Sequence, residues 1–344
     1  MKPGTLLIRA DANVSIGTGH VMRCLALAQA WQDRGGTAGF VASELPVPLA
    51  DRLARERIVP AMISAIPGSS DDAAATIAQA RQAGANWVVI DGDRFQTGFL
   101  KLVHDAGLRV LLIDDFAHRE GIPVELIVNP NPGVDSETYR MRAAGAKVLA
   151  GPRYCLLRRE FRVAAEAAER SERIGNRVLI SLGGSDPDNL TPRIAAALAG
   201  CADLQLTLVA GPGNHAIDEL RRLHAANVRV IWDAKNMAEL MSLADIAVIA
   251  AGGTLWELLA MGCAVLSYAR NAMQKSVLQS LARDGVIVEM GDAAAFDSAT
   301  LALEVKRLSE SSSAQKRMAG LGRTLVDGAG ADRVVDAMMQ SGVC

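Results

Sequence analysis

Short apolar runs rich in β-branched residues alternate with longer Ala- and Leu-rich segments along the whole chain. The short runs predict buried strands, and the longer segments, where apolar residues recur at helical spacing, predict helices. Strands that alternate with helices are typical of βαβ units, in which helices cover both faces of a parallel sheet. The pattern therefore predicts an α/β fold.

The predicted strands fall into two series, separated by a charged, alanine-rich segment at 158–176 that carries no strand pattern. The strands of the first series are 6–10, 38–42, 58–63, 87–90, 109–113 and 124–128. Helices between them are expected near 20–34, 47–56, 71–83 and 97–106. The strands of the second series are 178–181, 205–209, 228–231, 246–249 and 264–267. We interpret the segment without strands as a linker.

A length of 344 residues with 50% apolar residues is enough for two domain cores. We therefore predict a Rossmann-like domain at 1–157, the linker at 158–176, and a second Rossmann-like domain at 177–344 that ends in helices. Open α/β sheets bind ligands at the carboxyl ends of their strands. Two such domains would place a ligand cleft between the carboxyl ends of both sheets.

Composition narrows the possible partners. A net charge of −2 provides no basic surface for a polyanion, so we expect no nucleic-acid partner. The five cysteines form no C-x-x-C pair, and an odd number without a recognisable signal peptide favours reduced thiols, a cytoplasmic location and no structural metal site. The apolar stretch 237–268 is interrupted by Asp245, a glycine pair and Glu257, so we expect no transmembrane segment there.

A glycine-containing turn joins the first predicted strand to the first helix, with the sequence Ser-Ile-Gly-Thr-Gly-His at 15–20. Glycines at such a junction let backbone N–H groups face an anion, and His20 is the first proton-transfer group beyond them. The dinucleotide fingerprint G-x-G-x-x-G needs a third glycine where Met22 stands, so we expect neither NAD nor FAD nor another cofactor. We predict that Gly17 and Gly19 lie beside a phosphate; the alternative is a plain turn with a helix-capping histidine.

A second glycine turn follows the strand at 178–181 and contains Gly183, Gly184 and Ser185. Helix capping alone would explain this segment, because Ser185 or Asp186 can cap a helix and Pro187 suits its first turn. Two adjacent glycines, however, also allow a diphosphate to approach bare backbone. Both interpretations remain open at this turn.

A third glycine turn follows the strand at 246–249 and contains Gly252, Gly253 and Thr254. Thr254 and Glu257 have the spacing of a capping box, which would be a purely structural role. A capping box does not need two preceding glycines, and a carboxylate one turn into the helix could bind a ribose diol. We therefore favour nucleotide binding at this turn.

Acidic residues follow two strands of the first series, at 91–93 and 114–115. They should face the same cleft as the glycine turns. Because such residues are often only loop caps, we take Asp93, Asp114 and Asp115 as possible additional polar groups of the site.

These segments together resemble bacterial nucleotide-sugar hydrolases of pseudaminic acid biosynthesis, which cleave UDP-2,4-diacetamido-2,4,6-trideoxy-β-L-altropyranose, and related spore-coat polysaccharide proteins that are glycosyltransferase-like. The matching stretches are 16–28 (Ile-Gly-Thr-Gly-His-Val-Met-Arg-Cys-Leu-Ala-Leu-Ala), 113–115, 151–154, 156–161, 183–187, 252–257 and, more loosely, 271–274. They occur in the same order and span most of the chain.

The resemblance implies a GT-B fold, in which two Rossmann-like domains face each other and the second holds most of the nucleotide. It implies that His20 is catalytic, that 183–185 and 252–254 lie near the diphosphate, that Glu257 binds the ribose and that Asn271 lies near the sugar. The chain departs from the family at Asp93, where the hydrolases tend to have tyrosine, and at 129–132. Both departures leave the identity of the sugar open.

The implied reaction is attack of water at the anomeric carbon of a UDP-sugar, which releases UDP and a free hexose. UDP is a weakly basic leaving group, so activation of water is the harder step. A histidine at a helix N-terminus feels the positive end of the helix dipole, and we expect a lowered pKa that keeps His20 basic near neutral pH. The alternatives are a glycosyltransferase, in which His20 activates an acceptor hydroxyl, and a non-catalytic binding protein.

Overall fold

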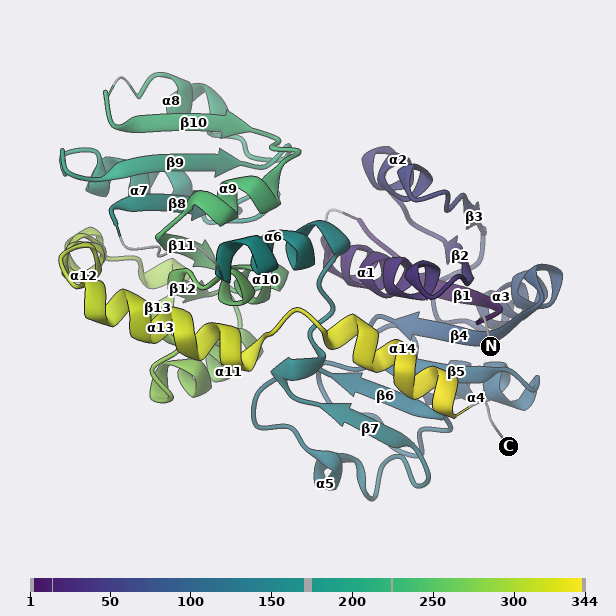
Figure 1. Cartoon of the computed structure of the whole chain (residues 1–344). Helices are drawn as coiled ribbons and strands as arrows, with labels where there is room; N and C mark the ends of the chain where they lie inside the picture. The colour runs from purple at the N-terminus through teal and green to yellow at the C-terminus, as the bar shows by residue number, and fades with distance from the viewer. Residues whose placement is uncertain (1–2, 14, 170–174, 224, 342–344) are drawn as a thin grey trace. The chain divides into compact units, whose positions relative to one another are not determined.

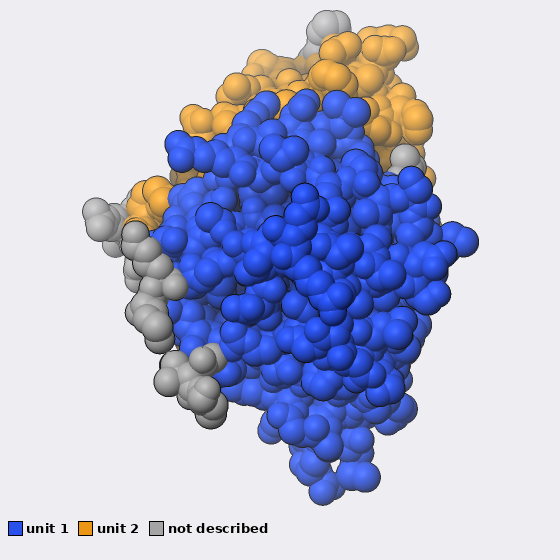
Figure 2. Space-filling view, turned by 90° about the vertical axis from the view of Figure 1, so that its right-hand side faces the viewer, with its two compact units in different colours: residues 1–159, 328–344 blue, residues 160–327 orange. Residues whose placement is uncertain are grey.

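The computed structural model describes residues 3–13, 15–169, 175–223 and 225–341. The chain forms two compact units (Figures 1 and 2): unit 1 comprises Met1–Arg159 and Gly328–Cys344, and unit 2 comprises Glu160–Asp327. Each unit contains one parallel sheet with helices on both of its faces, as the alternation of strand and helix patterns predicts.

Unit 1 has a seven-stranded sheet in the order β3-β2-β1-β4-β5-β6-β7. Its strands are β1 (Thr5–Ala10), β2 (Thr37–Ala42), β3 (Pro60–Met62), β4 (Ala85–Asp91), β5 (Arg109–Ile113), β6 (Leu126–Asn129) and β7 (Lys147–Ala150). Its helices are α1 (Gly19–Asp33), α2 (Val47–Arg55), α3 (Ser70–Ala83), α4 (Thr97–Asp105), α5 (Ser136–Tyr139), η1 (Pro152–Tyr154) and α14 (Gly330–Gln340).

The central strand β1 shows why the sequences of the strands are apolar at consecutive positions. Ile8 pairs with Phe40 of β2 on one side and with Val89 of β4 on the other. Ile8 packs into the core beneath α1, whereas Leu7 packs into the opposite core with α3 and α4. Successive side chains of a strand point to opposite faces, so a strand buried on both faces needs apolar residues at consecutive positions.

Unit 2 has a six-stranded sheet in the order β10-β9-β8-β11-β12-β13. Its strands are β8 (Arg177–Ser181), β9 (Gln205–Ala210), β10 (Val228–Trp232), β11 (Ile246–Ala250), β12 (Ala264–Ala269) and β13 (Ile287–Asp292). Its helices are α6 (Arg159–Glu169), α7 (Leu190–Leu198), α8 (Ile217–Arg221), α9 (Met237–Leu243), α10 (Gly253–Met261), α11 (Ala272–Arg283), η2 (Ala293–Ala295), α12 (Ser298–Ser309) and α13 (Ser312–Leu325).

The edges of the sheets differ from the sequence-based expectation. The edge strands β7 and β13 lie outside the predicted strands, and the expected strand at 58–63 shortens to the edge strand β3. An edge strand is covered less than a central one, so its sequence carries a weaker apolar signal. Residues in β7 and β13 are accordingly mostly half-buried or exposed.

The end of the chain also differs from the expected domain boundary. The predicted second domain runs to residue 344, but the segment Gly328–Cys344 is part of unit 1. Val334, Val335 and Met338 of α14 are buried in the core beneath α1. A Cβ atom on Gly330 would overlap the carbonyl oxygen of Cys155, so glycine lets α14 begin directly against η1. Periodicity identifies the apolar face of a helix but not the surface that covers it.

The predicted linker and the apolar stretch have regular structure. The linker at 158–176 contains α6, and its residues 170–174 lie outside the described part of the chain. The stretch 237–268 divides into α9, β11, α10 and most of β12. Within the described residues, none of the helices combines the length and apolar character that crossing a bilayer would need.

Candidate active site

The switch point of the unit 1 sheet lies between β1 and β4. From β1 the chain continues to β2 on one side, and β4 lies on the other side and leads to β5. Ligands of open α/β sheets bind outside the carboxyl ends of the strands at such a point. His20 stands in the first turn of α1, the helix that follows β1, and Asp91 is the last residue of β4. The topology therefore brings these two residues together.

The turn before α1 is shaped by Asn13 and Gly17. The Asn13 side-chain oxygen accepts the N–H groups of Ser15 and Ile16 at 2.8 Å each, and the Asn13 carbonyl accepts the N–H of Gly17 at 2.9 Å. Gly17 has φ +75°, which favours glycine. α1 begins at Gly19, and no side-chain hydrogen bond caps it at Thr18. Because His20 lies inside the helix, it is not the N-cap of the alternative interpretation.

His20 belongs to a charged cluster centred on the buried carboxylate of Asp91. His20 Nδ1 lies 2.7 Å from Asp91 Oδ1, and Arg23 donates to both oxygens of Asp91 at 2.6 Å each. Cys24 adds a thiol hydrogen bond to Asp91 at 3.5 Å, and Arg23 also donates to Asp115 at 2.8 Å. The Asp91 oxygen lies nearer to His20 Nδ1 than Arg23 Nη2 does, at 2.7 against 3.2 Å, and a carboxylate only accepts, so we assign the tautomer with hydrogen on Nδ1. Nε2 then carries the free lone pair.

The pKa of His20 moves in the opposite direction to the one predicted. The negative charge of Asp91 raises the pKa of His20 above its ordinary value and outweighs burial, which lowers it. A charge at hydrogen-bond distance exceeds the partial charge of a helix end. For Asp91 itself, burial raises the pKa, but Arg23 and His20 together outweigh burial and hold the pKa of Asp91 well below its ordinary range. The pair is thus built around a permanent carboxylate.

The three predicted acidic residues have different environments. Only Asp115 joins the cluster, through its ion pair with Arg23. Asp114 is buried and bonded to Arg119 at 2.6 Å and to the Tyr139 hydroxyl at 3.0 Å, so it supports the loop after β5. Asp93 is 57% exposed and lies 3.4 Å from Arg119 and 3.3 Å from His118. Neither Asp93 nor Asp114 shares a hydrogen bond with the His20 cluster in the described structure.

The switch point of unit 2 lies between β8 and β11, and both glycine pairs follow these two strands. In the first turn, the Leu182 carbonyl accepts from Arg270 at 3.1 Å and the Gly184 carbonyl accepts from the N–H of Gly213 at 2.9 Å. In a trans peptide the N–H points opposite to the C=O. The N–H groups of Gly183 and Ser185 therefore point away from these partners, which is the orientation that anion binding requires.

A further loop supports this turn, and sequence reasoning missed it. Gly211 and Gly213 follow β9, and a Cβ atom on Gly211 would overlap the Gly184 backbone. The close approach of the two backbones requires glycine at this position. The available signal was a Gly-Pro-Gly sequence directly after a predicted strand.

Asp186 fulfils the capping role that was considered for it. Its carboxylate accepts the N–H groups of Leu190 and Thr191 at 3.1 and 2.7 Å, the first two residues of α7. Pro187 lies before the helix and not in its first turn, because Asn189 is the N-cap residue. Capping and an exposed glycine backbone thus coexist in this turn, and the two interpretations were not exclusive.

At the other glycine pair, Gly252 is the N-cap residue of α10 and Gly253 is its first helical residue. No side-chain hydrogen bond caps this helix end, and Thr254 lies inside the helix, so the capping box does not form there. Gly252 and Gly253 are exposed, and a Cβ atom added to either would meet no described atom within 4 Å. Glu257 is half-buried one turn further along α10. The N-terminus of α10 is thus open to an anion.

Asn271 is exposed at the N-cap position of α11, where its side-chain oxygen accepts the N–H of Gln274 at 2.9 Å. The Gln274 side chain accepts the N–H of Arg270 at 2.8 Å in return. The amide oxygen of Asn271 is therefore used in capping, and its NH₂ group is the part that remains for a ligand.

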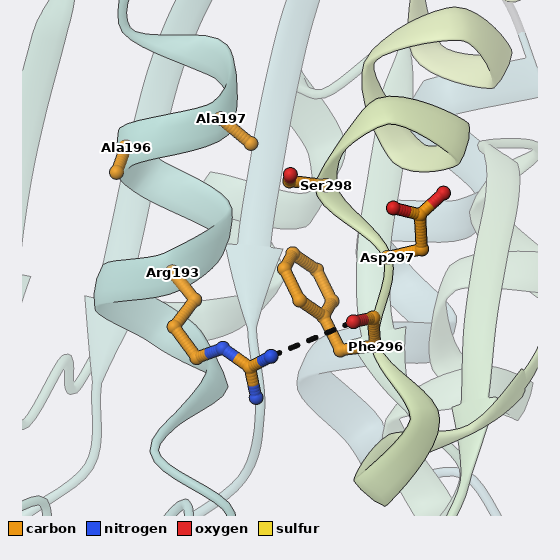
Figure 3. Close-up of a pocket in the computed structure, with 6 residues that line it drawn as sticks. All are labelled: Arg193, Ala196, Ala197, Phe296, Asp297 and Ser298. Atoms are coloured by element: carbon orange, nitrogen blue, oxygen red, sulfur yellow. Dashed lines mark hydrogen bonds between the residues drawn. The ribbon is translucent and has the colours of Figure 1, made fainter.

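A cavity of about 430 Å³ lies in unit 2, between α7 and the start of α12, and Figure 3 shows residues that line it. Arg193 stacks 4.6 Å from the centre of the Phe296 ring and donates to the Phe296 carbonyl at 3.5 Å. Asp297 caps α12 by accepting the N–H of Thr300 at 2.9 Å. None of the predicted site residues lines this cavity, and its polar groups serve local structure.

Two residues of the His20 cluster, Asp91 and Arg23, were not predicted, although the sequence contains an indication of each. Asp91 ends an apolar strand in the same Asp-Gly-Asp sequence from which Asp93 was selected. Arg23 follows His20 by three positions, which places both on one face of α1. Their partnership depends on the neighbouring strands β1 and β4, which local sequence does not specify.

No family model matches the chain. It is 27% identical over 293 residues to the UDP-2,4-diacetamido-2,4,6-trideoxy-β-L-altropyranose hydrolase of Campylobacter jejuni, covering 83% of this chain and 98% of that protein. It is 29% identical over 195 residues to the spore coat polysaccharide biosynthesis protein SpsG of Bacillus subtilis, covering 55% and 57%. An uncharacterised Methanocaldococcus jannaschii protein is 26% identical, with 78% of this chain and 56% of that protein covered. The chain thus spans little more than half the length of two of these relatives.

Solved structures resemble the whole chain. MurG of Acinetobacter baumannii matches with a TM-score of 0.70 at 17% identity, covering 98% of this chain and 99% of that one. The UDP-GlcNAc 2-epimerase of Neisseria meningitidis bound to UDP-GlcNAc matches with a TM-score of 0.68 at 11% identity, covering 98% and 100%. Arabidopsis thaliana UGT89C1 in complex with UDP matches with a TM-score of 0.67 at 12% identity, covering 98% and 100%. The predicted GT-B fold with two Rossmann-like domains is confirmed.

Proposed function

We propose that the protein hydrolyses a UDP-sugar by attack of water at the anomeric carbon, releasing UDP and a free acetamido-deoxy hexose for nonulosonic (pseudaminic) acid biosynthesis. The observation that carries the proposal is the His20–Asp91 pair, with 2.7 Å between Nδ1 and Oδ1, at the switch point of unit 1. The hydrolase of Campylobacter jejuni, which resembles 83% of the chain, supports the substrate class.

In the proposed reaction, His20 Nε2 accepts a proton from water while the water oxygen bonds to the anomeric carbon. The bond from that carbon to the diphosphate oxygen breaks, and its electron pair leaves with UDP. Asp91 keeps the proton on Nδ1 and stabilises the imidazolium that forms. Because Asp91 raises the pKa of His20, the neutral base forms only above that raised pKa. We therefore expect kcat/KM to fall as the pH drops through it.

Unit 2 would bind the nucleotide of the UDP-sugar. The outward N–H groups of Gly183 and Ser185 and the uncapped N-terminus of α10 are positioned to accept a diphosphate. Such donors stabilise negative charge that grows on the leaving group as the bond lengthens. Glu257 would bind the ribose diol, and the Asn271 NH₂ group would face the sugar.

The alternative function is a UDP-sugar-dependent glycosyltransferase of surface polysaccharide synthesis, supported by the likeness to SpsG. In that reaction His20 would deprotonate an acceptor hydroxyl instead of water. All nucleotide contacts would stay the same.

Incubation of the purified protein with UDP-sugars and no acceptor separates these functions. Release of UDP together with free hexose supports hydrolysis, and loss of this release in His20→Ala assigns it to the site. Release only after addition of a sugar or lipid acceptor would replace hydrolysis by transfer. Binding of the UDP-sugar without turnover under either condition would leave a binding protein.

A further inference from the structure

We propose that Arg270 of unit 2 is a diphosphate-binding residue, which fixes the glycine turn at 183–185 and donates from Nη1 to a phosphate oxygen on that turn. The inference rests on the proposed function, because it assigns a side chain to the nucleotide of the same substrate. Arg270 follows β12 and directly precedes Asn271 and α11.

The Arg270 guanidinium is held in place from three directions. Nε donates to Asp188 at 2.7 Å, and Nη2 donates to the Leu182 carbonyl at 3.1 Å and to Asp186 at 3.3 Å. The side chain is only 24% exposed. An arginine fixed in this way loses little further entropy when it binds a ligand.

The remaining nitrogen, Nη1, lies over the glycine turn. It is 3.9 Å from the position that a Cβ atom on Gly183 would occupy. Within the described residues, no hydrogen bond engages Nη1, whereas Nε and Nη2 are both used. Nη1 is thus the Arg270 donor that remains for a phosphate oxygen beside Gly183.

The two carboxylates beside Arg270 do not remove this role. Both carboxylate oxygens of Asp186 accept hydrogen bonds from the start of α7. The donors are the N–H groups of Leu190 and Thr191 and, at 2.6 Å, the Thr191 hydroxyl. Asp188 accepts from Nε and not from Nη1.

Lysine could not replace Arg270 in this geometry. An ammonium group is a point charge, whereas the guanidinium contacts Asp188, the Leu182 carbonyl and the phosphate through separate nitrogens of one rigid plane. Arg270→Lys should therefore keep positive charge near the turn but lose part of the geometry. We expect an intermediate effect for this variant.

The test compares the affinities for UDP and for uridine, which lacks phosphate, by calorimetric titration. The variants are Arg270→Gln, Arg270→Lys and the matched control Arg283→Gln, which removes the same charge from the far end of α11. We expect Arg270→Gln to weaken UDP binding about 10- to 100-fold, the range of one charge-assisted hydrogen bond, and to leave uridine binding nearly unchanged. Arg283→Gln should leave both affinities unchanged.

Three results would overturn the assignment or its basis. Unchanged UDP affinity in Arg270→Gln would remove Arg270 from the diphosphate site. Equal loss of UDP and uridine affinity in both Arg270 variants would make the residue a purely structural support of the turn. If the wild-type protein binds neither UDP nor a UDP-sugar, the proposed function and this inference are both wrong. If the wild-type protein binds UDP and Arg270→Gln binds it equally well, only this inference is wrong.

Discussion

The two units have the same strand order around their switch points but place different chemistry there. The switch point of unit 1 holds titratable and charged side chains, with Asp91 buried beneath His20 and Arg23. The switch point of unit 2 presents glycine backbone at 183–184 and 252–253. Side chains can move a proton, whereas backbone N–H groups bind an anion without titrating. The same strand order thus carries titratable side chains at one switch point and glycine backbone at the other.

Removal of the imidazole tests the assignment of proton transfer to unit 1 and should have the largest effect. We expect His20→Ala to lower kcat about 10²- to 10⁴-fold, the usual contribution of a positioned base, while the Kd for UDP stays nearly unchanged. Steady-state kinetics and calorimetry measure the two quantities. His104→Ala is the matched control, because His104 is 42% exposed on α4. A parallel loss of UDP affinity in His20→Ala would contradict the division of tasks.

Asp91→Asn tests whether the carboxylate sets the protonation of His20. Its charge is the main cause of the raised pKa of His20, so the variant should lower that pKa and move the acid limb of kcat/KM to lower pH, at a reduced maximum. Histidine titration by NMR provides the second readout. An acid limb that stays in place would separate Asp91 from catalysis.

The same substitution changes how stability depends on pH. The pKa of His20 is higher in the folded protein than in the unfolded chain. Its contribution to folding stability is therefore fully present below its pKa in the unfolded chain, and it is lost as the pH rises through its pKa in the folded protein. The pKa of Asp91 is lower in the folded protein than in the unfolded chain. Its contribution to folding stability is therefore present above its pKa in the unfolded chain, and it is lost only as the pH falls through its pKa in the folded protein. Asp91→Asn also breaks a buried ion pair and should cost about 3 kcal/mol of unfolding free energy at neutral pH, measured by urea denaturation. A loss well below this would mean that Arg23 finds another partner.

Gly253→Ala tests whether unit 2 binds the diphosphate through backbone N–H groups that no side chain covers. A Cβ atom meets nothing described within 4 Å, and alanine favours a helix over glycine by about 0.5–1 kcal/mol, so the melting temperature should stay equal or rise. The added methyl group stands where a phosphate would approach, and UDP affinity should fall about tenfold. Higher stability together with lower affinity distinguishes a ligand surface from a structural turn. Unchanged affinity would move the diphosphate away from α10.

Asn271→Asp should have the smallest effect and separates capping from sugar recognition. Aspartate caps helices about as well as asparagine, so the stability of α11 should be retained. The substitution removes the NH₂ donor, and we expect a severalfold higher KM for the UDP-sugar with unchanged affinity for UDP. Asn271→Ala, which loses both functions, should in addition cost about 1 kcal/mol of stability. Identical kinetics in Asn271→Asp and wild type would leave Asn271 as a cap only.

The central strands and the glycine turns could be predicted because their signals are local. Consecutive apolar residues in β1 and β11 reflect burial on both faces, and glycines after those strands mark tight turns. The edge strands β7 and β13 could not be predicted in the same way, because partial exposure removes the apolar run. The roles of the site residues remain predictions that the variants above can test.

Sequence alone determined the α/β class, the two series of strands and the position of His20 beyond a glycine turn, because each depends on neighbouring residues. Only the tertiary structure decided that His20 pairs with Asp91, which is 71 positions away, and that α14 returns to unit 1. It also decided that Arg270 supports a turn 88 positions earlier. Such partnerships follow from strand order, and strand order is fixed by packing of the whole sheet, for which a local pattern carries no signal.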